Sequence, residues 1–222
     1  MTLTDILEQF RRDNPEITDR VADDDVVKDW AFSADKEFCA ITRCIVGDDT
    51  FDSVASTSVY DTRYDLTALV DKFYDIDTFP GGGVSFDDDP LDKTTVAELD
   101  EEDSDWRNRS AGTPEKYYRR GKYLYFDYPI KTAGEEIRVY VVLISDDFTG
   151  ISQVPYNGLT YLEPYHVGIL KYLTWMGKGK IGKPGEAGEK RKEFLDYAQW
   201  AKSQIGGNKY SPIHYTKSGA YS

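Results

Sequence analysis

The chain has 222 residues, of which 40% are hydrophobic and 30% charged, as is typical of a globular protein that buries a real core. Its longest apolar run, Val139–Ile144, is far too short to span a bilayer. The first twenty residues lack the apolar stretch of a signal peptide, so none is expected. The formal net charge of −13 argues against a protein that reads nucleic acid through a basic face.

Charge is divided unevenly along the sequence. From Lys171 onward there are ten lysines and arginines and four acids, a net of +6, so the preceding 170 residues have a net charge of −19. Uniform acidity would favour only solubility. This division predicts a molecule whose two ends meet different partners.

Four segments have the apolar spacing of amphipathic helices. Residues 3–12 have one apolar stripe, which Pro15 ends, and residues 24–46 have a longer one behind acids suited to an N-cap and first turn. Residues 162–176 and 186–205 show the same spacing, and the glycine-rich, basic stretch 177–185 connects them. These segments predict a helical bundle built from both ends of the chain.

The clearest strand signal lies in the middle of the chain. Apolar and aromatic residues alternate with a period of two in Tyr123–Tyr128 and again in Ile137–Ile144. The connection contains Pro129 and Gly134, which predicts an antiparallel hairpin over 123–144. Residues 51–79 are apolar enough for short strands, but their period is mixed. We therefore expect an α+β fold, in which N- and C-terminal helices form a bundle with a β-rich middle insertion over 51–150.

An acidic stretch follows the Pro80–Gly83 break. Ten acids and one lysine lie between Asp87 and Asp105. Thr95 and Glu98 have the spacing of a capping box, which predicts one helical turn within an otherwise solvated loop. The spacing of an EF-hand calcium loop is absent. The acids of interest here are Asp87, Asp88, Asp89, Asp92, Glu101, Glu102 and Asp103.

No stretch satisfies a catalytic or cofactor motif. Gly177–Lys183 fits the first seven positions of a phosphate-binding loop, but Pro184 stands where a Ser or Thr must hold magnesium, and a helix precedes it. The two histidines, His166 and His214, lack partners at metal-ligand spacing, and there is no nucleophile motif. We expect each histidine to serve packing or an interface.

Cysteine and tyrosine usage also favours no enzyme. Cys39 and Cys44 stand five residues apart in a helical pattern, which suits neither a disulfide framework nor a C-x-x-C site, so we expect a reduced, cytosolic folding environment. The seventeen tyrosines leave a carbohydrate-binding interpretation open, but their spread along the chain is more typical of interfaces. Forty acids make accidental carboxylate pairs common, so no glycosidase pair is singled out.

The order of several short motifs is distinctive. After the helical N-terminus come Tyr64-Asp65-Leu66, Leu99-Asp100, Trp106, Gly112-x-Pro114-x-x-Tyr117, Gly121-x-x-Leu124-x-Phe126-x-x-Pro129, Val139-Tyr140 and a helical hairpin with a basic turn. Over roughly residues 23–205 this order resembles the head–tail adaptor, or connector, proteins of tailed bacteriophages. The family often has Pro-x-Pro at the end of the first hairpin strand, where this chain retains only Pro129.

The resemblance implies a structural role in a virion, with no catalytic residue, cofactor or metal. Such adaptors are made in the host cytoplasm and assemble, often as about twelve copies, in a ring under the portal protein. The ring extends the channel for double-stranded DNA, which passes without specific binding, and gives a tail or nozzle protein its attachment platform. No membrane contact is implied. The alternative is a carbohydrate- or receptor-binding β-module of a phage tail.

Two sets of candidate residues follow from this resemblance. Residues 208–222 have no periodicity and are expected to form a flexible, extended C-terminal arm after a single adaptor domain over 1–207. The acidic stretch is expected to line the channel or face the tail, because like charge limits sticking to phosphates. The arm residues expected to bind portal are Lys209, Tyr210, Pro212, Ile213, His214, Tyr215, Lys217 and Tyr221.

Overall fold

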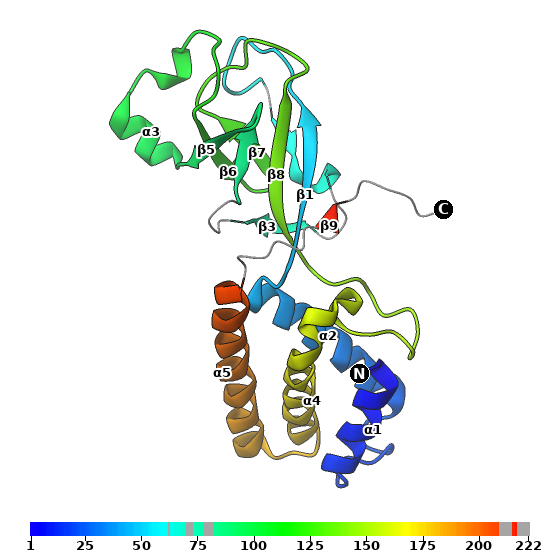
Figure 1. Ribbon diagram of the computed structural model, residues 1–222. Coiled ribbons are helices and arrows are strands. Elements are labelled where there is room, and N and C mark those ends of the chain that lie inside the picture. Colours follow the sequence, from blue (N-terminus) through cyan, green and yellow to red (C-terminus); the bar gives the residue numbers. More distant parts are fainter. Residues whose placement is uncertain (62, 70–72, 78–81, 209–214, 217–222) are drawn as a thin grey trace. The chain divides into compact units, whose positions relative to one another are not determined.

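The computed structural model describes residues 1–61, 63–69, 73–77, 82–208 and 215–216 (Figure 1). The chain divides into two compact units. The helical unit comprises Met1–Ile45 and Ile144–Pro212, and the sheet unit comprises Val46–Leu143 and Ile213–Ser222. The single adaptor domain expected over 1–207 stays a prediction.

One mixed sheet dominates the sheet unit. Within the described ranges its strand order is β2-β7-β6-β5-β4-β8-β1-β9, and β3 pairs with β8. The β5–β6 and β1–β9 pairs are parallel. The strands are β1 (Ile45–Asp52), β2 (Tyr64–Asp65), β3 (Phe73–Ile76), β4 (Val84–Phe86), β5 (Asp89–Lys93), β6 (Lys116–Arg120), β7 (Tyr123–Phe126), β8 (Glu136–Leu143) and β9 (Tyr215–Thr216).

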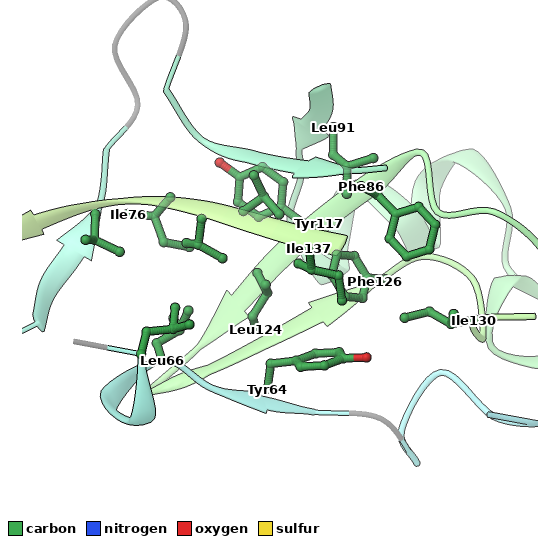
Figure 2. Close-up of a cluster of buried hydrophobic side chains, with 14 residues drawn as sticks. Tyr64, Leu66, Ile76, Phe86, Leu91, Tyr117, Leu124, Phe126, Ile130 and Ile137 are labelled. Atoms are coloured by element: carbon green, nitrogen blue, oxygen red, sulfur yellow. The ribbon is translucent and has the colours of Figure 1, made fainter. Parts of the chain in front are cut away.

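The sheet is nearly closed around a large apolar core, which Figure 2 shows. Side chains converge from strands β2 to β8, so every one of these strands contributes to the same interior. In the described residues, contacts of side chains, and no ladder hydrogen bonds, connect β2 with β1 and the residues that follow it. The rings of Phe51 and Tyr64 lie 5.1 Å apart, and the Val54 N–H donates to the Tyr64 hydroxyl at 2.9 Å.

The structure is α+β, but the expected helical bundle with a β-rich middle insertion is wrong, because the sheet dominates. The described residues between 45 and 93 form five strands, most of them too short for a readable period. In β5, only Leu91 is buried and the flanking Asp89, Asp92 and Lys93 are exposed. Because of these charged residues, the strand has the composition of a solvated loop.

The hairpin expected over 123–144 is also wrong. Strand β7 pairs with β6 through a two-residue turn at Gly121, whose φ is +62°, as the first position of such a turn favours. Strands β6, β5 and β4 separate β7 from β8 in the sheet. The strands β7 and β8 are neighbours in the sequence but do not pair with each other, since β8 pairs with β4 and β3.

The helical unit has four α-helices in its described residues. They are α1 (Leu3–Asp13), α2 (Asp24–Thr42), α4 (Val167–Lys180) and α5 (Pro184–Asn208), and the short 3-10 helices η3 (Tyr156–Gly158) and η4 (Thr160–Tyr165) precede α4. Helix α4 packs against α1, α2 and α5. The segments expected to be helical are helical apart from their ends. The main difference is that α2 stops at Thr42, and Ile45 begins β1.

Close packing explains one glycine of α4. A Cβ on Gly177 would lie 2.1 Å from Cδ1 of Ile17, which sits in the segment between α1 and α2. A Cβ on Gly179, in the same helix, would meet only the Cβ of Ala187 at 3.9 Å. A side chain at 177 would therefore force the buried Ile17 to shift, whereas position 179 has room for one.

We expect Gly177→Ala to destabilise the protein by about 1–3 kcal/mol, because the added methyl overpacks the contact with Ile17. The matched variant Gly179→Ala should be neutral or stabilising by up to about 1 kcal/mol, the usual gain from replacing helical glycine. Chemical denaturation of the two variants measures the difference. Equal effects of the two substitutions would contradict the packing explanation.

The contact between Tyr64 and Val54 gives a second prediction. Tyr64→Phe keeps the buried ring but removes the acceptor of the Val54 N–H, and should lower the free energy of unfolding by about 1–2 kcal/mol. Tyr74, whose side chain is 41% exposed, provides the control, and Tyr74→Phe should change little. An unchanged stability of Tyr64→Phe would show that the sheet does not depend on this hydrogen bond.

Candidate functional site

The expected portal-binding arm lies almost wholly outside the described residues. Lys209, Tyr210, Pro212, Ile213, His214, Lys217 and Tyr221 are not described. Only the backbone of Tyr215–Thr216 is, as β9, which pairs in parallel with Gly47 and Asp48 of β1. The binding role of these residues stays a prediction.

The acidic stretch is more ordered than the expected loop. Asp87 and Asp88 form a two-residue turn between β4 and β5, with φ values of +50° and +68°, the conformation of a type I′ hairpin turn. Asp89 and Asp92 lie on exposed positions of β5. The expected capping box between Thr95 and Glu98 is present and begins α3 (Val96–Glu102).

Basic residues neutralise several acids near the end of α3. Asp100 pairs with Arg107, and Asp103 pairs with Arg109 at 3.1 Å. Glu102 pairs with Lys116, whereas no ion pair is seen for Glu101 in the described chain. Arg107 holds the pKa of Asp100 below its usual range. The Asp105 backbone N–H, followed by Arg109, lowers the pKa of Asp103 in the same way. The seven candidate acids thus do not form one uniform patch.

The residues of the adaptor-like motifs form an interlocked framework in the sheet unit. Trp106 is fully buried and donates from Nε1 to Asp100 at 2.9 Å, while its ring meets that of Tyr118 edge-on. The Gly112 N–H donates to the Pro129 carbonyl at 2.9 Å. Tyr117 lies opposite Phe126 in the β6–β7 ladder, and both are buried. The motif spacing therefore reflects contacts between its members.

A buried carboxylate secures this framework. Asp127 accepts the backbone N–H groups of Glu115 and Lys116 at 3.0 and 2.9 Å. It also pairs with Arg109 at 3.3 Å. The segment before β6 is thereby fixed to the end of β7, which explains why an aspartate follows the apolar Phe126.

The phosphate-loop-like stretch does not form a strand-to-helix loop. Its first four residues, Gly177–Lys180, complete α4. Lys178 pairs with Glu16 and Glu186, and Lys183 pairs with Glu186. The close packing of Ile17 accounts for the first glycine, so the run is a basic helix–helix connection.

A buried polar cluster in the helical unit is the main chemical feature that the sequence did not indicate. Asp35 of α2 is fully buried, and its Oδ2 accepts the backbone N–H of Tyr156 at 3.3 Å. Its Oδ1 lies 3.6 Å from Sγ of Cys39, one turn further along the helix. Cys44 lies beyond the helix end, with its Sγ 3.7 Å from that of Cys39.

The C-terminal cap of α2 brings the two thiols together. Arg43 adopts a left-handed conformation with φ +55°, and its N–H donates to the Cys39 carbonyl at 2.8 Å. In such a cap, the residue after the left-handed position commonly contacts the last turn of the helix. Cys44 occupies that position and Cys39 lies in the last turn, so the chain reversal directs their side chains to each other.

Burial shifts the protonation of this cluster. It raises the pKa of the Asp35 carboxyl from 3.8 to about 6, despite the opposing effect of the Tyr156 N–H. It also raises the pKa of the Cys39 thiol well above its usual value. At neutral pH the Cys39 thiol is therefore protonated, and a small fraction of Asp35 is protonated as well.

Tyr156 and His166 adjoin the cluster. The Tyr156 ring stacks on Phe38 at 5.0 Å between centroids, and its hydroxyl donates to the Tyr165 carbonyl at 3.2 Å. The His166 ring lies 5.5 Å from that of Tyr156, and in the described chain neither of its nitrogens has a hydrogen-bond partner. Burial lowers the pKa of His166 to about 4, so it is a neutral packing residue.

One sequence signal could have located part of this cluster. Asp35 and Cys39 lie four residues apart on the helix face whose other members are buried, including Phe38 and Thr42. A carboxylate on an apolar stripe is unusual enough to indicate a buried partner. The thiol contact depends on where α2 ends, and the expected helix over 24–46 placed Cys44 inside it.

Other kinds of site find little support. A hollow of about 250 Å³ lies between α1 and α2, lined in part by Leu7, Glu8 and Ile151. In the described ranges, no group of three or more His, Cys, Asp and Glu side chains is arranged to hold a metal ion. Across the same residues no helix is both long and apolar enough to cross a membrane.

Comparison with known protein families and with curated proteins finds no match to this chain.

The pKa of Asp35 predicts a pH-dependent stability. Because the folded-state value is raised, the contribution of Asp35 to stability is full below pH 3.8 and is lost as the pH rises through about 6. Asp35→Asn does not titrate, so the stability of this variant relative to the native protein should rise by on the order of 3 kcal/mol between pH 4 and pH 7.

Denaturation of both proteins across this pH range measures the effect. Comparing the two removes the opposite contribution of His166, whose lowered pKa favours the fold above pH 6.5. A stability difference that does not vary with pH would contradict the raised pKa.

Proposed function

We propose that this protein is a structural head–tail adaptor of a bacteriophage virion, without catalytic activity. It would form a ring beneath the portal protein, extend the DNA channel and give a tail or nozzle protein its attachment platform. The observation that supports this proposal is the interlocked framework around Trp106, Gly112 and Pro129. Residues that define the adaptor-like order contact one another, as residues of a shared scaffold should.

The character of these residues favours a scaffold over an enzyme. Trp106, Leu124 and Phe126 are buried, and Gly121 meets a conformational need of a turn. Functional residues of an enzyme would instead place polar groups around an open cavity. The proposal therefore assigns function to surfaces, and locates the protein in the virion neck after synthesis in the host cytoplasm.

Portal binding tests the proposal. The full chain, mixed with portal rings of the same phage, should form rings on them that electron microscopy detects. Deletion of residues 209–222 should abolish the complex if the arm provides the attachment. Because this deletion also removes β9, a second truncation that ends after Thr216 is needed to separate arm contacts from sheet pairing.

The outcomes distinguish the alternatives. Loss of binding in both truncations, with unchanged thermal unfolding, supports the arm, and binding by both refutes the arm while leaving the adaptor role. Failure of the full chain to bind portal refutes the adaptor role. Saturable binding of an oligosaccharide by a chain that ignores portal would establish the alternative of a carbohydrate-binding tail module.

A further inference from the structure

The contact between Cys39 and Cys44 has a chemical consequence. Both are free thiols, with side chains 0% and 1% exposed, and their Sγ atoms lie 3.7 Å apart. Both belong to the helical unit. A structural explanation is sufficient for the burial, since small apolar side chains suit a helix cap. The same contact also places the two thiols where they can react with each other.

The geometry is close to what a disulfide requires. An S–S bond is about 2.05 Å long, so the sulfurs must approach by about 1.7 Å. Rotation of the two side chains can provide movement of this kind, because the cap of α2 already brings the two sulfurs into contact. Arg43 and the chain reversal would stay in place.

We propose that Cys39 and Cys44 form an oxidation site, at which an intrachain disulfide forms once the protein leaves a reducing compartment. This inference rests on the proposed function, because a virion protein is made in a reducing cytoplasm and released into an oxidising medium. The disulfide would join the last turn of α2 to the residue preceding β1. It would fix the helix cap in particles outside the host.

The reaction is a thiol–disulfide exchange with a small-molecule disulfide. One cysteine thiolate attacks the oxidant's S–S bond, forms a mixed disulfide and releases one small thiol. The other thiolate then attacks the cysteine sulfur of that mixed disulfide and releases the second small thiol. Both cysteines are oxidised, the oxidant is reduced to two thiols, and the two cysteine protons are taken up by the departing thiolates.

Burial determines the rates of the two steps. The first step needs a local opening, because neither thiol is exposed and the pKa of Cys39 is raised. Oxidation of the folded protein should therefore be slow. The second step should be fast, since the partner sulfur is adjacent, so the mixed disulfide should not accumulate. The finished bond would be equally shielded from reductants.

Oxidised glutathione and the full chain test the proposal. After incubation of the folded protein, maleimide labelling under denaturing conditions should show both thiols lost together. Intact mass should show the loss of two hydrogen atoms with no added glutathione. Thermal unfolding of the product should shift upwards by a few degrees, because the bond constrains the unfolded chain. The shift should disappear only after prolonged incubation with dithiothreitol, since the buried bond is reduced slowly.

The variants Cys39→Ala and Cys44→Ala are matched controls, each of which keeps one thiol. Neither should show the reversible thermal shift, and each should at most acquire one glutathione. In the native chain, two thiols that stay reactive to maleimide after prolonged oxidation would overturn the proposal. A stable glutathione adduct or a disulfide-linked dimer would overturn it as well. The assay contains no portal, so a chain that forms the bond but ignores portal refutes only the adaptor role.

Discussion

The sheet unit depends on the pairing and packing of strand β8. It is the strand that β4 and β3 share as a pairing partner, and β1 adjoins it in the sheet order. Strands of three or four residues such as β4 and β3 have little stability alone, so they need a template of this length. Ile137, Val139 and Val141 of β8 are also fully buried in the core. Loss of β8 would remove the pairing partner of β3 and β4 and three buried side chains of the core.

The parts of the fold that could be predicted are those with long, regular patterns. Helices α1, α2, α4 and α5 each repeat an apolar stripe over several turns, and β8 alternates from Glu136 to Val141. Strands such as β5 have one buried residue among charged ones, so no period exists to read. Their pairing is set by contacts distant in sequence. The Asp92–Lys116 register of β5 with β6, for example, spans the whole of α3.

The candidate sites were predictable to different degrees for physical reasons. The capping box at Thr95 is a local interaction, visible within four residues. The cluster around Asp35 is visible only in part, because Asp35 and Cys39 share an apolar helix face but Tyr156 comes from a segment more than a hundred residues away. The thiol pair depends on a single left-handed residue, Arg43, which is neither glycine nor asparagine and so gives no sequence signal. The two thiols meet because α2 ends before Cys44, and the apolar pattern of the sequence does not specify where this helix ends.

The segment Tyr156–Gly158 bears on the order in which the protein folds. Three consecutive residues have positive φ values, of +57°, +56° and +69°, and only the last is glycine. Each non-glycine residue in this conformation costs roughly 1 kcal/mol, so the segment is not stable by itself. The Asp35 carboxylate and the Phe38 ring hold it in place, and both require a formed α2. We therefore expect the segment to settle after the folding transition state, so that substitutions within it accelerate unfolding more than they slow folding.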